Sequence, residues 1–449
     1  MGFFGGVMLT ANVVSQWINN ARTKKDIQRV YNDAAEANYK SRAVFALPYL
    51  NKVQLLLTTV DSTDIDNDVY KYESGSKTPA LDYLWGEHEN PESVLVSGGR
   101  QEERNRAMMP FLCKAQNEGI PVVALHSDNN DLETLIKGYG FTHEFISQNG
   151  YYYDAFRSLP VDDIVFLLYE TMPGKITSPN AEALIRSLVE MLLRTEGNVT
   201  FHGLATFPLA NLMDKLNKLK VDSEVTNDEF NEISSYYMAG SSEVAAVRIY
   251  LNKLNRQAEN IFGNITSDLC NIKKMLNIKG IVSINTGIGN NDLILTFIIN
   301  QFLYYQSVGR NFAVMVDNVS LSKFTSLCEL IRGRIYAISH EDFVSSLHGG
   351  DKKSDDIFAE ITGGVSNVVL FNHKSGTSCQ KWSEHLGKYH KIKIKMNISQ
   401  TKSFAMGGNT RGISVEEADE PRVRSETISM LPDSLACIHN RNGTLFAEI

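Results

Sequence analysis

The residues best suited to chemistry follow a short apolar strand early in the chain. The segment Val94–Leu112 reads VLVSGGRQEERNRAMMPFL, in which Gly98 and Gly99 separate the predicted strand from a helix that ends in an apolar run. A strand, a glycine turn and a helix form the arrangement in which backbone N–H groups hold phosphates. The sequence therefore predicts a loop of the nucleotide-binding type at this position.

The side chains that a working loop of this type needs are missing. A lysine normally meets the β- and γ-phosphates, and a hydroxyl after it holds Mg²⁺. The residues in these two places are Glu103 and Arg104 or, one position later, Arg104 and Asn105. A carboxylate at Glu103 would repel a triphosphate in a poorly solvated loop. We therefore expect either a loop that has kept its layout and lost its chemistry, or a chance likeness.

A second candidate lies at the end of a later strand. Phe312–Asp317 is an apolar run that ends in an acid, as does the ATPase strand whose aspartate meets Mg²⁺. In an active ATPase a glutamate usually follows and activates water, whereas Asn318 cannot accept a proton. The alternative is a plain turn, because Asp-Asn also ends strands for that purpose.

Two further strand ends carry polar groups. His340 follows a strand predicted from Arg334 and stands beside Glu341, which is compatible with acid–base chemistry, although a structural histidine is the more usual case. Asn285–Gly289 also follows a predicted strand, but it has no lysine and no suitably placed hydroxyl. We expect a simple strand-to-helix turn there.

The charge pattern excludes a surface that is basic all over. The 449 residues carry a formal net charge of −8, so nucleic acid could be bound only by a local patch. Lys391–Lys395 places its lysines on one face of a predicted strand, where they could meet DNA or protect a solvated edge. Alternating charges after the glycine pair favour a solvated helix face over a phosphate site. These residues are Arg100, Glu102, Glu103, Arg104 and Arg106.

Other segments predict no site. The five cysteines are isolated from one another, which favours free thiols in a reducing compartment. Residues 1–20 are too polar to span a membrane, and their helical spacing of apolar residues favours docking on a partner or a membrane surface. The acids of Asp61–Asp68 lack the glutamate of a calcium loop, so we expect a solvated loop.

The order of the elements predicts an α/β protein. Short apolar runs separated by helical stretches indicate buried parallel strands, whereas residues 161–262 show helical periodicity almost throughout. We predict five segments. They are an N-terminal helical and strand region (1–90), a first core part (91–155), an inserted helical domain (156–265), a second core part (266–398), and a linker with a closing hairpin (399–449).

Beyond these elements, the sequence resembles the HerA/FtsK superfamily, and within it the TraG/TraD type of conjugative coupling protein. The resemblance covers roughly residues 93–449 and departs from the family at three catalytic positions. The loop lysine is absent, Asn318 replaces a glutamate, and Ser339–Glu341 replaces a glutamine that senses the γ-phosphate. The matching segments are Met109–Leu112, Ser375–Ser378, Ser383–Gly387, Arg422–Ile428 and Leu431–Asp433.

The resemblance implies a RecA-like P-loop NTPase core with a mainly parallel sheet and an inserted all-helical domain. Members of the family form hexameric rings and move DNA or protein towards a secretion channel. The departures predict a degenerate ATPase with no assigned catalytic residue. ATP with Mg²⁺ is the one cofactor to consider, and Asp317 is the metal ligand. The residues that match the family's nucleotide site are Gly98, Gly99, Glu103, Arg104, Asn105, Asp317, Asn318 and His340.

Two alternatives stay open at this point. The chain could hydrolyse ATP with substitutes such as Arg104 and Asp317, or it could be a nucleotide-free scaffold in which the glycine pair is a packing turn. The expected partners are other copies of the chain, further conjugation or secretion subunits, and DNA. The expected location is the cytoplasm at the inner face of the membrane, with contact only through residues 1–20 or a partner.

Overall fold

The computed structural model describes most of the chain, and all structural statements refer to these residues. The described ranges are 24–42, 44–46, 71–72, 92–147, 150–174, 178–263, 269–270, 272–287, 291–319, 325–348, 354–401, 408–440 and 443–449. Two sequence-based interpretations, the docking helix in residues 1–20 and the solvated loop at Asp61–Asp68, lie outside them. Among the described helices, none is long and apolar enough to cross a membrane.

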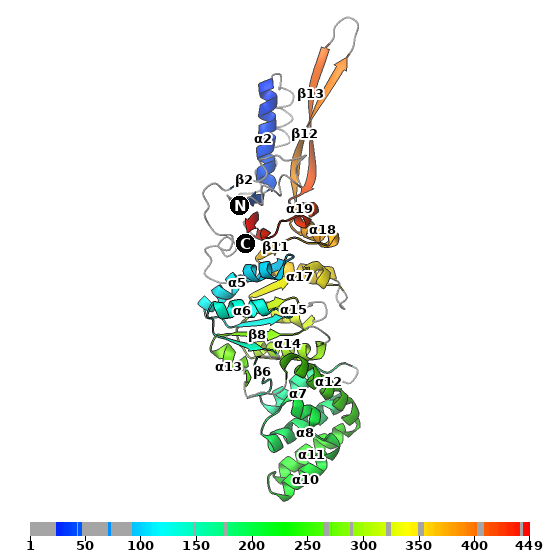
Figure 1. Ribbon diagram of the computed structural model, residues 1–449. Coiled ribbons are helices and arrows are strands. Elements are labelled where there is room, and N and C mark those ends of the chain that lie inside the picture. Colours follow the sequence, from blue (N-terminus) through cyan, green and yellow to red (C-terminus); the bar gives the residue numbers. More distant parts are fainter. Residues whose placement is uncertain are drawn as a thin grey trace.

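A sheet of eleven strands forms the centre of the molecule (Figure 1). Neighbouring strands run parallel, except in the two pairs that involve β14 (Leu435–Asn440). In spatial order the strands are β2 (Lys71–Tyr72), β1 (Val44–Ala46), β15 (Gly443–Glu448), β14, β11 (Asn367–Leu370), β3 (Val94–Ser97), β10 (Tyr336–His340), β9 (Ala313–Asp317), β4 (Val122–His126), β8 (Ile281–Asn285) and β5 (His143–Ile146).

The central strands form because their side chains are apolar on both faces. Val94 and Val96 pack on one side of the sheet and Leu95 on the other, and all three are fully buried. Such double-sided burial is typical of a parallel sheet covered by helices. The covering helices are α5 (Gln101–Asn117), α6 (Asn130–Gly138), α13 (Ile272–Asn277), α14 (Asp292–Ser307), α15 (Thr325–Ile331), α16 (Phe343–Ser346), α17 (Ser354–Gly364), α18 (Gly376–His385) and α19 (Ser425–Ser429).

A helical region interrupts the core between two short paired strands, β6 (Tyr152–Tyr153) and β7 (Leu269–Cys270). Its apolar core is continuous with one layer of the sheet. Phe201 of this region lies 4.9 Å from Phe156 and 5.2 Å from Phe297 of α14, measured between ring centroids. The helices are α7 (Val161–Glu170), α8 (Pro179–Glu196), α9 (Phe201–Thr206), η1 (Leu209–Asn211), α10 (Leu212–Val221), α11 (Asn227–Gly240), η2 (Ser241–Glu243) and α12 (Val244–Phe262).

This architecture confirms the predicted fold class, a mainly parallel α/β core with an inserted helical region. The helices of the insertion fall where the sequence shows 3.6-residue periodicity, and α8 is a clear example. Ser178 accepts a hydrogen bond from the N–H of Ala181 at its start, and Gly197 ends it with φ of 72°. Both signals are typical helix boundaries.

A two-stranded ribbon projects from the core next to the helix α2 (Lys24–Arg42), as Figure 1 shows. Its strands are β12 (Lys388–Thr401) and β13 (Gly408–Pro421). The carboxamide of Asn38 bonds to both backbone groups of Ile392, at 2.7 and 3.0 Å. An α2 side chain thus occupies part of the open edge of β12, which would otherwise present unpaired backbone groups.

The ribbon corrects the prediction of a linker from Ser399 onwards. Most of that stretch forms β13. The sequence pattern did not indicate this strand, because neither strand of the ribbon faces a large apolar core. The lysines of Lys391–Lys395 are also paired. Lys393 Nζ lies 2.7 Å from Glu420 and Lys395 Nζ lies 2.6 Å from Glu416. The cross-strand acids neutralise this face, which favours the solvated ribbon over a DNA-binding strand.

We expect the free energy of unfolding to fall as the pH drops from about 6.5 to about 4. Burial, then His385 and Arg422, lower the pKa of His439 in β14 to about 4. The unfolded chain therefore binds this proton first, which weakens the fold by on the order of 1–3 kcal/mol at acidic pH.

Urea denaturation at neutral and acidic pH measures the effect. His439→Gln should flatten the pH dependence, whereas His202→Gln, at a side chain that is 58% exposed, should leave it unchanged. Equal pH profiles for wild type and His439→Gln would contradict the assignment.

Candidate functional site

The turn after β3 is shorter than a phosphate-binding loop of the Walker type. Phosphate-binding loops of the G-x-x-x-x-G-K-[ST] type separate their glycines by four residues. Here Gly98 and Gly99 are adjacent, and only these two residues and Arg100 connect β3 to α5. The predicted order of strand, glycine turn and helix is present, but the loop is shorter than that motif.

Both glycines are needed for close packing. Gly98 and Gly99 have φ of 88° and 68°, which other residues rarely adopt. A Cβ on Gly98 would lie 2.7 Å from the His373 ring, and one on Gly99 would lie 2.7 Å from Phe371 Cβ. The turn is therefore shaped by the chain that leaves β11.

The amides of the turn are used within the protein. Gly98 N–H donates to the carbonyl of His340 at 3.1 Å, and Gly99 N–H donates to that of Asn372 at 3.0 Å. Arg100 N–H donates to Glu103 Oε2 at 2.7 Å. The backbone N–H groups of all three turn residues are thus bound to acceptors of the chain itself.

Glu103 supplies a buried anion inside the turn. Glu103 is only 7% exposed, and its carboxylate accepts hydrogen bonds from the N–H groups of Arg100 and Ser434. A Cβ on Gly99 would meet Glu103 Oε2 at 2.7 Å, so the carboxylate fills the concave side of the turn. The predicted solvated helix face is therefore wrong for Glu103, because the first turn of α5 faces the sheet.

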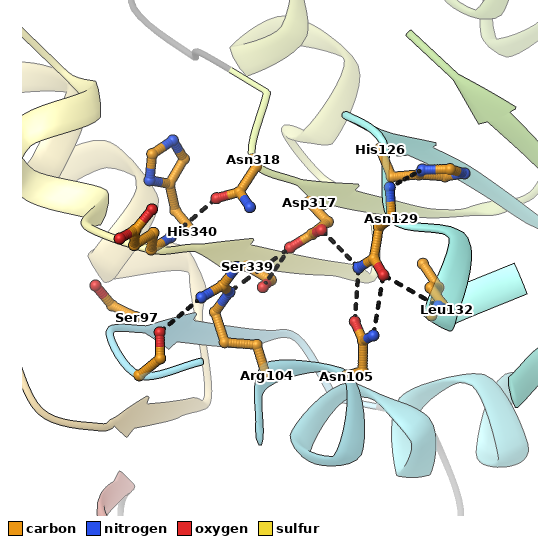
Figure 2. Close-up of polar contacts among 12 residues, drawn as sticks. Ser97, Arg104, Asn105, His126, Asn129, Leu132, Asp317, Asn318, Ser339 and His340 are labelled. Atoms are coloured by element: carbon orange, nitrogen blue, oxygen red, sulfur yellow. Dashed lines mark hydrogen bonds and ion pairs between the residues drawn. The ribbon is translucent and has the colours of Figure 1, made fainter. Parts of the chain in front are cut away.

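Arg104 supplies a buried cation, which also contradicts the solvated face. It is 3% exposed, and its Nη1 donates to the carbonyl of Gly99 at 2.9 Å. Its Nε lies 3.9 Å from Oδ1 of the fully buried Asp317 (Figure 2). Burial lowers the pKa of Arg104, and the charges of Asp317, Glu341 and Glu103 oppose that shift. By contrast, Arg100 and Arg106 are exposed, as expected.

Each carboxylate oxygen of Asp317 accepts a hydrogen bond from a neighbouring side chain. Ser339 Oγ donates to its Oδ1 at 2.7 Å, and Asn129 Nδ2 donates to its Oδ2 at 2.7 Å. Among the described residues, no group of three or more acids, histidines or cysteines is placed to hold a metal ion. With Arg104 as counter-ion, these residues do not fit Mg²⁺.

Asn105 reaches Asp317 through Asn129. The two carboxamides exchange hydrogen bonds of 2.7 and 3.0 Å, as Figure 2 shows. Asn129 also caps α6 by accepting from Leu132 N–H at 3.0 Å, and its own N–H donates to His126 Nδ1 at 3.1 Å. The sequence reasoning missed Asn129 and His126 as parts of this centre, and it named Ser339 only as part of the segment that departs from the family. A helix-cap signal could have marked Asn129, but nothing in the sequence pointed it towards Asp317.

Asn318 and His340 stand apart from this centre and line the cleft above it. Asn318, with φ of 53°, donates from its N–H to the carbonyl of Ser339 and accepts from Glu341 N–H, both at 2.9 Å. His340 Nδ1 accepts from Asp342 N–H at 3.1 Å. Burial, and then the charge of Arg104, lower the pKa of His340, which favours a neutral ring.

An open cleft of about 910 Å³ lies over these residues at the carboxyl ends of the strands. Ligands of open α/β sheets usually bind at this edge. Four acids line it against three cations, a balance that does not favour a polyanion. The acids are Asp128, Glu341, Asp342 and Asp433, and the cations are Arg100, Arg104 and Lys374.

Among solved structures, the fold is similar to that of the bacterial conjugative coupling protein TrwBdeltaN70 in its unbound monoclinic form. The TM-score is 0.50 at 13% identity, over 82% of this chain and 90% of that one. Plasmid coupling protein TrwB in complex with ADP and Mg²⁺ gives 0.49 at 14% identity, over 80% and 85%. VirB4 of Thermoanaerobacter pseudethanolicus gives 0.34 at 11%, over 65% and 79%. No protein-family model and no curated protein match the sequence. At these identities the similarity establishes the fold alone.

Gly98→Ala should destabilise the fold by about 2 kcal/mol or more, because the new Cβ meets His373 and the backbone has positive φ. Gly309→Ala is the matched control, since Gly309 has φ of 80° and open space around it. Urea denaturation of both variants separates the steric effect from the backbone effect. Equal losses of stability would show that packing against His373 is unimportant.

Proposed function

We propose that this chain is a catalytically inactive, coupling-protein-like component of a conjugation or type IV secretion-like system. It acts in the cytoplasm through binding to other copies or partner subunits and does not hydrolyse ATP. The fold similarity to a bacterial conjugative coupling protein supports the general class. The segments matched to that family at Ser375–Ser378 and Leu431–Asp433 support it further.

One observation supports an inactive protein in this proposal. The chain itself provides both charges that a magnesium nucleotide would bring. The carboxylate of Glu103 fills the turn where a phosphate would sit, and the guanidinium of Arg104 faces Asp317 where the metal would sit. Binding a magnesium nucleotide would expel both groups. Arg104 would then be a buried charge without a partner, which is costly.

The same geometry favours a nucleotide-free protein over an active translocase. Asn318 uses its carboxamide oxygen to accept from Glu341 N–H and has no carboxylate with which to activate water. The turn amides already have acceptors within the chain. In this proposal the glycine pair is a packing turn, and residues 156–265 form a helical domain for contacts with other proteins.

Calorimetry with ATP and Mg²⁺ should show no binding at millimolar nucleotide, and phosphate release should stay at the level of the buffer. Turnover that disappears in Asp317→Ala would contradict the proposal and establish an active enzyme. Binding without turnover would contradict only the nucleotide-free version.

A double-mutant cycle tests the role of the buried pair. Asp317→Asn should cost about 3–5 kcal/mol, because it leaves Arg104 charged and unpaired. Arg104→Met combined with Asp317→Asn should cost clearly less than the sum of the single changes. Additive losses would show that the pair is not coupled. A loss of Mg²⁺ affinity without a loss of stability would identify Asp317 as a metal ligand.

A further inference from the structure

Cations gather at the edge of the sheet opposite the cleft. The group consists of Lys279, Arg310 and Arg334, which precede β8, β9 and β10 in that order. The three strands run in the same direction, because β8 pairs parallel with β4, β4 with β9 and β9 with β10. Arg334 donates to the carbonyls of Arg310 and Phe312, both at 3.1 Å, and lies 4.2 Å from the centroid of the Phe312 ring. Within the described ranges, none of the three cations forms an ion pair with a carboxylate.

Two apolar side chains are exposed among these cations. Ile278 is 50% exposed and precedes Lys279 directly, and Val308 is 54% exposed and lies two positions before Arg310. We call Ile278, Lys279, Val308, Arg310 and Arg334 the basal patch. A nucleic acid would bind the cations of the basal patch and leave both apolar side chains uncovered. An acidic polypeptide segment with an apolar residue matches both features.

This chain carries a segment of that chemistry. The end of α10, the turn after it and the start of α11 carry Val221, which is 82% exposed, and the exposed acids Asp222, Glu224 and Asp228, with one exposed cation, Lys220, beside them. We call residues 221–228 the acidic turn. In Figure 1 α10 lies at the end of the helical region that is remote from the sheet. The acidic turn of one molecule is therefore placed to meet the patch of another.

We propose that the acidic turn of one copy binds the basal patch of a second copy. The two surfaces differ, so the contact is head-to-tail and adds copies in one direction. Val221 would lie against Ile278 and Val308, while Asp222 and Glu224 would face Lys279 and Arg310. The proposal uses no residue of the cleft and is independent of whether the protein binds a nucleotide.

Charge reversal with mixing tests this contact. Sedimentation velocity of the full chain should show self-association that weakens at high salt. The patch variant Lys279→Glu/Arg310→Glu and the turn variant Asp222→Lys/Glu224→Lys should each weaken it by about tenfold or more. Mixing the two variants should restore association, because each reversed surface then meets an opposite charge on the other protein.

The variant Lys253→Glu/Arg256→Glu is the matched control, with the same charge change on exposed residues of α12. It should associate like the wild type, and thermal unfolding should confirm that all variants are folded. A wild-type protein that is monomeric at every concentration would overturn the proposal, as would mixing that restores nothing. So would duplex DNA binding that is lost in the patch variant while self-association is unchanged.

Discussion

The ion pair between Arg104 and Asp317 is the constraint on which the site depends. Two charges this deeply buried are tolerated only together. Ser339 and Asn129 donate hydrogen bonds to Asp317, and Asn129 also caps α6 and holds Asn105 of α5. One carboxylate therefore fixes the starts of two helices against the ends of β9 and β10.

The glycine turn illustrates how the same residue type can serve different purposes in similar backbone layouts. A phosphate-binding loop keeps glycines so that the backbone can approach a ligand. Here Gly98 and Gly99 allow the chain that leaves β11 to approach the start of α5. His373 and Phe371 occupy the space that a Cβ on either glycine would need. The residue type is the same in both cases, and the neighbouring atoms determine its role.

The parts of the fold that could be predicted depend on local patterns. The buried strands and the helical insertion follow from apolar runs and periodicity, and the closing hairpin from a turn signal. The burial of Glu103 and Arg104 could not be predicted, because alternating charges on a helix do not reveal which face meets the sheet. Asn129 follows β4 and Ser339 lies in β10, and only the strand order brings both to Asp317. Part of β12 was predicted as a strand, but β13 was missed because it pairs with β12 and not with a core.

The pairing of β1 with β15 affects how the chain can fold during synthesis. Val44 lies opposite Thr444, so β1 has no permanent neighbour on that side until nearly all of the described chain has been made. The same delay applies to β3, which stands between β10 and β11 although it precedes both by more than two hundred positions. Such distant pairings slow folding and leave strand edges exposed for longer on the ribosome. The nascent protein would therefore depend on chaperones more than a protein whose neighbouring strands are consecutive.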